Sequence, residues 1–299
     1  MDRLHLMNVF LAVGEAESFA GGARRLAMSP PAVTRAIAAL EASLGVRLLD
    51  RTTRFVRVTE AGQRYLDDAR RIINEVDEAD EAAAGINAEP RGHLAVTAPV
   101  LFGRMFVTAG IVAYLQRYPG MEVSALFLDR VVNLLEEGLD VGVRIGELSD
   151  SNMKAIGVGH VRRVVCASPV YLKQHGTPKV PSEVAHHLVV VSSAVTPNVE
   201  WKFIRDTKTT IVRVKPRFTV TSNEAAIEAV LQGFGITRLL SYQIGPYLAS
   251  GQLKTLLEKF EPRRLPVHIL HREGRYASAK VRTFVDLMVA RLRSNQALN

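Results

Sequence analysis

Residues 18–37 read SFAGGARRLAMSPPAVTRAI, a stretch that predicts two short helices joined by a tight turn at Ala27 and Met28. Ser18 is a favourable helix cap, because its side chain can accept a hydrogen bond from a free backbone N–H of the first turn. Small and apolar residues follow at helical spacing and allow a second helix to approach closely: Ala20, Ala23 and Leu26. The stretch therefore has the pattern of a helix-turn-helix motif.

The second helix of this pair presents two different faces. We expect Ser29 to cap it and Pro30 to occupy its first position, where a missing N–H costs nothing. Its buried stripe is predicted to be Val33, Ile37, Leu40 and Leu44. The opposite face carries Pro31, Thr34, Arg35 and Ala38. That face suits a helix in the major groove of DNA, where base edges are approached closely. The alternative is an ordinary helical hairpin packed into a core.

Residues 46–62, VRLLDRTTRFVRVTEAG, follow as an alternating segment that predicts a two-stranded wing. Arginines are spaced along it at Arg47, Arg51, Arg54 and Arg57. Guanidinium groups on such a hairpin can contact phosphates or reach into a minor groove. The alternative is a solvated hairpin whose arginines contact only water.

The succession of motif and wing from Phe10 to Gly62 resembles the amino-terminal half of LysR-type transcriptional regulators. The resemblance implies a winged helix-turn-helix DNA-binding domain over residues 1–59, which binds double-stranded promoter or operator DNA. The DNA-binding residues expected on this basis are Ser29, Pro30, Pro31, Thr34, Arg35, Arg51, Thr52 and Arg54. Many members carry glutamine where this chain has Pro30, so their sequence preference does not carry over.

Residues 60–89 predict one long linker helix, capped by Thr59 and free of proline. Apolar residues step by four and three, which is the spacing of a coiled-coil seam: Tyr65, Ala69, Ile72, Val76, Ala79, Ala83 and Ile86. The seam has no other obvious cover, so we expect it to pair with a second copy of the chain. The alternative is a single helix surrounded by solvent. The resemblance likewise implies a dimer through this helix. We expect a homotetramer, although the sequence leaves dimer against tetramer open, and RNA polymerase as a further partner.

The net charge of +8 is unevenly distributed along the chain. Residues 1–59 carry +3, residues 60–89 carry −6, and residues 90–299 carry +11. The motif, and not the overall charge, therefore supports DNA binding. No apolar run approaches the roughly 18 residues of a membrane span, and the amino terminus lacks a basic start, so we expect a cytoplasmic protein. The single cysteine, Cys166, lies in an apolar run and is expected in a buried strand.

From Pro90 onward strands alternate with helices, which predicts an α/β domain with a parallel sheet and crossover helices. In the first half we expect strands at 93–98, 122–128 and 139–145, and helices at 104–118 and 130–137. A second round begins near His160, and a terminal strand at 266–271 and helix at 277–292 rejoin the first half. The effector-binding domain, 90–299, would thus have two lobes with a cleft between them: 90–160 with 268–299, and 161–267.

This region resembles the LysR effector domain, which has a two-lobed, type 2 periplasmic-binding-protein fold. The matching segments are TAPVLFG at 97–103, DRVVNLLEEGLDVGVRIG at 129–146 and GFGI at 233–236. Two helices are predicted to start directly after strands, at Ala98–Pro99 and Thr221–Ser222, and free N–H groups at helix starts attract anions.

We therefore expect a small anionic effector. The expected effector-binding residues are Ala98, Pro99, Val100, Phe102, Asp129, Arg144, Ser192, Thr221, Ser222 and Phe234. The alternative is that Arg144 pairs with Asp129 or Glu147 and the helix starts hold only water.

Other chemistries find little support in the sequence. GFGI lacks the third glycine of a dinucleotide-binding loop, and the histidines lack the spacing of metal ligands, so no cofactor and no metal are expected. No nucleophile elbow or acid/base carboxylate pair is present, so we expect no catalytic residue and no enzyme activity. We predict a LysR-type DNA-binding transcriptional regulator controlled by an effector. The alternatives, a ligand-binding module or an enzyme on the binding-protein fold, do not explain the motif, wing and seam in succession.

Overall fold

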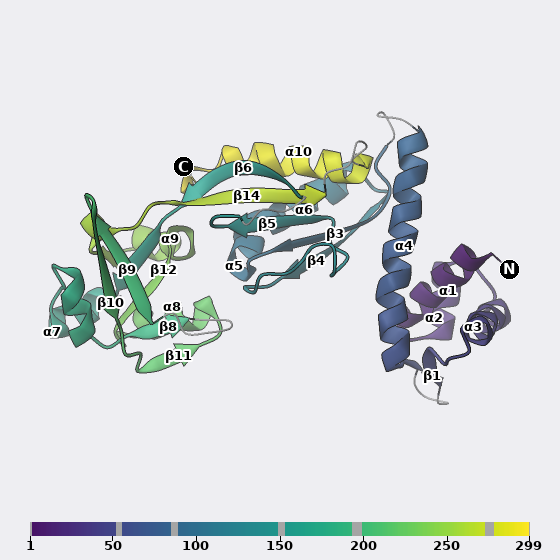
Figure 1. Cartoon of the computed structure of the whole chain (residues 1–299), viewed down its shortest axis with the longest axis horizontal. Helices are drawn as coiled ribbons and strands as arrows, with labels where there is room; N and C mark the ends of the chain where they lie inside the picture. The colour runs from purple at the N-terminus through teal and green to yellow at the C-terminus, as the bar shows by residue number, and fades with distance from the viewer. Residues whose placement is uncertain are drawn as a thin grey trace. The chain divides into compact units, whose positions relative to one another are not determined.

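The computed structural model describes residues 2–51, 56–84, 89–148, 153–192, 199–272 and 278–298. The chain divides into two compact units (Figure 1). One is built on Met1–Glu89, with Asn133–Gly138 and Tyr276–Ala279, and the other on Pro90–Val132, Leu139–Arg275 and Lys280–Asn299.

Three helices form the amino-terminal core: α1 (Arg3–Ala16), α2 (Phe19–Arg25) and α3 (Pro30–Leu44). Ser18 caps α2 as predicted, because its hydroxyl accepts a hydrogen bond from the N–H of Gly21 at 3.2 Å. The turn is closed by Ala27, whose backbone has a left-handed φ of 51°. Ala23 is buried, whereas Ala20, which we expected to help pack the second helix, is exposed. The predicted helix-turn-helix is therefore present.

The predicted wing follows as β1 (Leu49–Arg51) and β2 (Val56–Val58), an antiparallel pair in which Leu49 lies opposite Val58. The predicted DNA contacts Thr52 and Arg54 lie outside the described residues. Thr59 caps the next helix as predicted, since its hydroxyl accepts from the N–H of Gly62 at 2.9 Å. A β-carbon at Gly62 would overlap the carbonyl oxygen of Leu48, so the close approach of the wing requires glycine there.

The linker helix α4 spans Glu60–Ala84, and Glu89, where we expected the helix to end, is not helical. The first turns of its apolar seam are covered within the chain: Ala69 is fully buried, and the Tyr65 ring lies 5.8 Å from that of Phe10. The expectation that the whole seam is uncovered is therefore wrong for these positions. Ile72 and Val76 are half-buried and Ala79 is exposed, while Ile86 lies outside the described residues.

The first lobe of the carboxy-terminal unit is a five-stranded sheet in the order β4-β3-β5-β14-β6. Its strands are β3 (Gly92–Ala98), β4 (Met121–Phe127), β5 (Val141–Ile145), β6 (Met153–Val161) and β14 (Leu265–Arg272). The last strand rejoins the first half of the domain as predicted. The sheet is mixed and not purely parallel, because β14 runs antiparallel to both β5 and β6.

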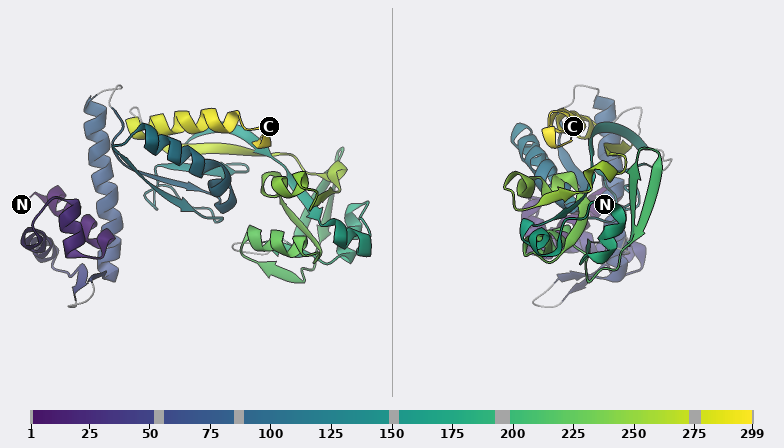
Figure 2. Two further views of the ribbon diagram at one scale, coloured as in Figure 1. Left: turned by 180° about the vertical axis from the view of Figure 1, so that it is seen from behind. Right: turned by 90° about the vertical axis from the view of Figure 1, so that its left-hand side faces the viewer.

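Helices of this lobe run continuously from α5 (Val100–Phe102) through a π-helical segment (Gly103–Val107) to α6 (Thr108–Arg117), so the helix begins before the expected residue 104. A β-carbon at Gly103 would overlap the ring of Phe127, which explains glycine at that point. Helix α10 (Ala279–Arg293) packs on α6, where the rings of Tyr114 and Phe284 are 5.2 Å apart (Figure 2).

The helix predicted over 130–137 is absent: residues 131–133 have no regular secondary structure and 134–138 form turns. Val132 and Leu134 are buried, and the Val132 carbonyl accepts a hydrogen bond from the Arg144 guanidinium at 2.9 Å. Packing and this side-chain bond thus replace the helical hydrogen bonds that the local pattern favoured.

The second lobe contains β7 (Arg163–Ala167) between β12 (Ile236–Leu240) and β13 (Lys254–Leu256). A parallel pair, β8 (Val190–Ser192) and β11 (Phe218–Val220), joins it through a bridge between Val189 and Ile236, and β9 (Glu200–Arg205) and β10 (Lys208–Arg213) form a hairpin. Its helices are α7 (Pro169–His175), α8 (Asn223–Leu231) and α9 (Ser241–Ala249), with short 3-10 turns at Pro181–His186, Glu258–Phe260 and, in the chain's last residues, Gln296–Leu298.

Apolar packing is continuous between the lobes, since Leu94 and Val96 of the first sheet belong to the same buried cluster as Val164 and Cys166 of β7. Cys166 lies in a buried strand as predicted, and burial raises the pKa of its thiol to about 12. Among the described residues, no helix combines the length and apolar character needed to cross a membrane.

Candidate functional site

The exposed face of α3 is the one predicted to meet DNA. Pro31, Thr34, Arg35 and Ala38 are all exposed, while Val33, Ile37 and Leu40 are fully buried on the opposite face. The Thr34 hydroxyl donates to the Pro30 carbonyl at 3.0 Å, which leaves its oxygen lone pairs directed outward to accept another hydrogen bond.

The start of α3 differs from the expectation for its cap. Ser29 holds the N-cap position, but its side chain makes no capping hydrogen bond. Pro30 and Pro31 occupy the first two positions and have no N–H, so the first N–H within the helix is that of Ala32, which donates to the Ser29 carbonyl at 2.9 Å. The Ser29 hydroxyl is therefore not used by the helix and lies exposed at its tip.

The wing places two further arginines, Arg47 and Arg57, at the surface. Arg51, a predicted DNA contact, belongs to β1 and lies opposite Val56 in the ladder. The wing arginines and the exposed face of α3 belong to one compact unit with the helix-turn-helix.

One carboxylate ties this head to the linker helix. Glu15 of α1 accepts hydrogen bonds from Arg25 of α2 at 2.5 Å and from Arg70 of α4 at 2.9 Å. Burial alone would raise the pKa of Glu15, but the hydrogen bonds from Arg70 and Arg25 outweigh it, and the pKa lies below its usual value of 4.5. The ionised carboxylate therefore fixes the three helices relative to one another.

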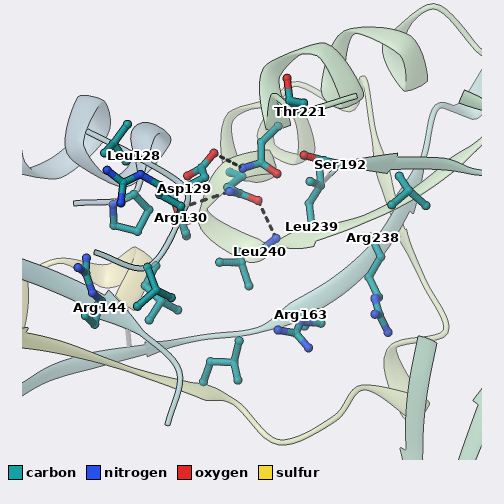
Figure 3. Close-up of a pocket in the computed structure, with 18 of the residues that line it drawn as sticks. Leu128, Asp129, Arg130, Arg144, Arg163, Ser192, Thr221, Arg238, Leu239 and Leu240 are labelled. Carbon is teal, nitrogen blue, oxygen red and sulfur yellow. Dashed lines mark hydrogen bonds between the residues drawn. The ribbon is translucent and has the colours of Figure 1, made fainter. Parts of the chain in front are cut away.

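A pocket of about 330 Å³ lies between the two lobes (Figure 3). It is lined by five of the predicted effector-binding residues: Pro99, Asp129, Arg144, Ser192 and Thr221. These residues come from the ends of strands or from the segments directly after them, so the structure brings distant parts of the chain together as the topology predicted.

The other five predicted residues do not line the pocket. Ala98 and Phe102 are fully buried in the core, and Val100 directs its N–H at Asp129. The Ser222 hydroxyl caps α8 by accepting from the Ala225 N–H at 3.1 Å. Phe234 lies on the surface, where its ring packs edge-on against Phe218 at 6.4 Å.

The charges on the pocket wall are predominantly positive. Four arginines line it, Arg130, Arg144, Arg163 and Arg238, against a single carboxylate among the described lining residues, Asp129. The sequence interpretation identified Arg144 and missed Arg130, Arg163 and Arg238. For Arg163 and Arg238 the available signal was the presence of arginine inside two largely apolar strands, VRRVVCAS and ITRLL.

Asp129 bridges the lobes. Its carboxylate accepts from the Val100 N–H at 3.1 Å and from the Asn223 side-chain amide, at the start of α8, at 3.0 Å. Partial desolvation at the pocket wall raises the pKa of Asp129, and the charge of Glu224 adds to this effect, although the side chain still reaches solvent. The helix-start N–H groups that we expected to attract a ligand anion are thus already near a carboxylate of the chain.

Both parts of the chain match family models. Residues 4–63 match the model described as "Bacterial regulatory helix-turn-helix protein, lysR family", and residues 87–293 match "LysR substrate binding domain". The chain belongs to the LysR family of bacterial transcriptional regulators. It is accordingly a DNA-binding transcriptional regulator with a carboxy-terminal effector-binding domain.

Individual LysR regulators resemble it over nearly their full length. The HTH-type transcriptional regulator CrgA of Neisseria meningitidis is 31% identical over 290 residues, which cover 97% of each chain. The HTH-type transcriptional activator AaeR of Escherichia coli is 31% identical over 288 residues, 96% of this chain and 93% of AaeR. A solved structure of CrgA, 30% identical, covers 99% of this chain and 100% of that one with a TM-score of 0.63.

Proposed function

We propose that this LysR regulator binds a small organic anion in the pocket between its lobes, and that binding alters its contacts with DNA. The observation that carries the proposal is the charge of the pocket wall, where four guanidinium groups face one carboxylate. A concave site of this size, with apolar walls and a few convergent charged groups, is typical of small-molecule binding.

On the DNA side, the proposed contacts are the exposed residues of α3 and the arginines of the wing. Arg35 is the base-reading candidate, because it is the one charged side chain on the exposed face of α3 and arginine pairs well with guanine edges. Ser29, Thr34 and the wing arginines would position the head on phosphates. The remaining predicted contacts, Pro30, Pro31, Arg51, Thr52 and Arg54, complete this surface.

The proposed assembly is a dimer through the linker helix, with a tetramer as the complete form. Ile72, Val76 and Ala79 continue the apolar seam beyond the part covered by α1, and a 25-residue helix is about 37 Å long. That length is close to the spacing of two major grooves on one face of a duplex. A cytoplasmic location, a periplasmic-binding-protein-like effector domain, contact with RNA polymerase and the absence of enzyme activity belong to the same proposal.

Anion binding would be coupled to DNA binding through the arrangement of the two lobes. An anion drawn to arginines of both lobes, with Asp129 already joining them, favours one lobe arrangement over another. A ligand of this kind shifts the equilibrium only by its difference in affinity for the two arrangements. DNA affinity would change to the extent that the two arrangements space the paired heads differently.

Footprinting on the DNA upstream of the protein's own gene tests the proposal. Wild type should protect a region of several helical turns, and Arg35→Ala should lose about 1–3 kcal/mol on that DNA with little change on random DNA. Arg57→Ala is the matched control, because it removes an exposed wing arginine and should weaken both DNAs alike. Equal losses from Arg35→Ala on both DNAs would remove its base-reading role, and an absence of protection by folded protein would contradict the proposed DNA surface.

A further inference from the structure

Two pocket arginines are neighbours on one face of the second lobe's sheet. In the antiparallel ladder of β7 and β12, Arg163 lies opposite Leu240 and Arg238 lies opposite Val165. Arg163 and Arg238 are therefore diagonal partners on the same face, close enough for long side chains to interact. Both line the pocket, on the side opposite Arg144 in Figure 3.

Among the described residues, few groups offset the positive charges of Arg163 and Arg238. Arg238 reaches the Glu200 carbonyl at a long 3.5 Å and lies over the Trp201 ring at 5.0 Å, and no ion pair to either arginine occurs among the described residues. Burial lowers the pKa of both side chains, and the charge of Arg163 lowers that of Arg238 further. Each guanidinium nevertheless stays charged at neutral pH, because its ordinary pKa is so high.

Two half-buried like charges side by side are unfavourable unless an anion completes them. A carboxylate or similar acidic group placed between two guanidinium groups accepts several charge-assisted hydrogen bonds in a fixed geometry. The pair thus has the chemistry of a second anion subsite, separate from Arg144 and Arg130 of the first lobe.

We propose that the effector is a dicarboxylate, with one acidic group beside Arg144 in the first lobe and the other held by Arg163 and Arg238 in the second. This inference rests on the proposed anion site between the lobes. A ligand charged at both ends contacts the arginines of both lobes, whereas a monocarboxylate pairs with the arginines of one lobe only. Leu240, which lies opposite Arg163 in the ladder and lines the pocket, would contact the apolar middle of the ligand.

Calorimetric titration and thermal shift of the full-length protein test the inference with pairs of equal length: succinate against butyrate, adipate against hexanoate, and terephthalate against 4-methylbenzoate, at matched ionic strength. At least one dicarboxylate should bind about tenfold or more tightly than its partner, the effect of one additional charge-assisted group. Monocarboxylates that bind as tightly as their partners would overturn the dicarboxylate and leave the anion site intact. No response to any of the six compounds would overturn both proposals.

Variants locate the second subsite. Arg163→Gln and Arg238→Gln should each weaken the best dicarboxylate about tenfold and leave its monocarboxylate partner within about twofold. Arg263→Gln is the matched control, since it removes an exposed arginine outside the pocket and should change neither. Without ligand, either pocket variant should melt at the same or a higher temperature than wild type, because like-charge repulsion is relieved. Equal weakening of both acids by the pocket variants, or a lower melting temperature in both, would contradict the assignment.

Discussion

Replacing Asp129 by asparagine should strengthen anion binding in the interlobe pocket and leave the fold intact. The Asp129 carboxylate accepts from the Val100 N–H and from the Asn223 amide, at 3.1 and 3.0 Å. The new amide can still accept from Val100, and Asn223 can turn its own oxygen toward the new N–H group. The substitution therefore removes a negative charge from the pocket wall while it preserves most of the hydrogen bonds at this position.

The size of the effect follows from the size of the pocket. A sphere of 330 Å³ is about 8.6 Å across, so Asp129 and a bound anion lie within about that distance. Two unit charges about 8.6 Å apart repel by about 1–2 kcal/mol at an effective dielectric constant of about 20–40. Salt at physiological strength reduces this to about 1 kcal/mol. The dissociation constant for the anion should therefore fall about fivefold.

Comparison with Asp129→Ala separates the effect of the lost charge from the effect of the lost hydrogen bonds. The alanine variant removes the same charge but also both hydrogen bonds of the carboxylate, of which the one from Asn223 joins the lobes. Each is worth about 0.5–1 kcal/mol in this partly solvated position. The free energy of unfolding should fall by about 1–2 kcal/mol in the alanine variant and change little in the asparagine variant. Urea unfolding of the full chain measures both values.

Calorimetric titration of adipate into wild type, Asp129→Asn and Glu228→Gln is the direct assay. Glu228 is an exposed residue of α8 outside the pocket, so its variant removes an equal charge without changing the pocket wall. The gain in Asp129→Asn should shrink at high salt. If Asp129→Asn binds no more tightly than Glu228→Gln, the electrostatic account of the pocket is wrong.

Asp129→Asn should also change the way in which the stability of the protein depends on pH. Because partial desolvation raises the pKa of Asp129 in the folded protein, the folded state binds a proton more readily than the unfolded state just above the ordinary value of 3.8. The contribution of Asp129 to stability therefore falls as pH rises through that window. Asp129→Asn should remove this slope from the urea midpoint just above pH 3.8, where wild type retains it.

Three further outcomes are expected in the amino-terminal unit. Glu15→Gln should cost about 1 kcal/mol at neutral pH, and because the pKa of Glu15 is lowered, this stabilisation should be lost from wild type as pH falls below about 4.5; urea titration at several pH values measures both. Gly62→Ala should lower the melting temperature of the DNA-binding head, since its β-carbon would overlap the Leu48 carbonyl, and an unchanged transition by calorimetry would contradict the crowding. Arg57→Ala should reduce the dependence of DNA affinity on salt by about one phosphate contact, which anisotropy titrations at several salt concentrations would detect.

Local signals predicted the amino-terminal unit well. The caps at Ser18 and Thr59 and the stripe of Val33, Ile37 and Leu40 depend on residues close together in sequence, so the pattern determines the structure directly. The segment 130–137 shows the opposite case. Its helical pattern was overridden by burial of Val132 and by a hydrogen bond from Arg144, which no local pattern contains.

The sequence predicted the position of the pocket, but only some of the residues that line it. Strand ends indicated Pro99, Asp129 and Arg144, because topology alone brings strand ends together. Arg163 and Arg238 become neighbours only through the register of β7 with β12, and more than seventy residues separate them in sequence. Phe102 was misplaced because a residue one helical turn beyond a strand end faces the core here.

The two prolines at the start of α3 change which groups of this protein are available to bind the phosphates of a DNA duplex. A helix tip normally offers its main-chain N–H groups to a phosphate, a contact that any residue except proline can make. Here Pro30 and Pro31 withdraw two of those donors, so on the proposed DNA surface the Ser29 hydroxyl and the arginine side chains would make the backbone contacts. Under that proposal the contacts with the sugar-phosphate backbone come from side chains and not from the main chain. Ionic strength and point substitutions would then change the residence time on DNA without altering helix α3.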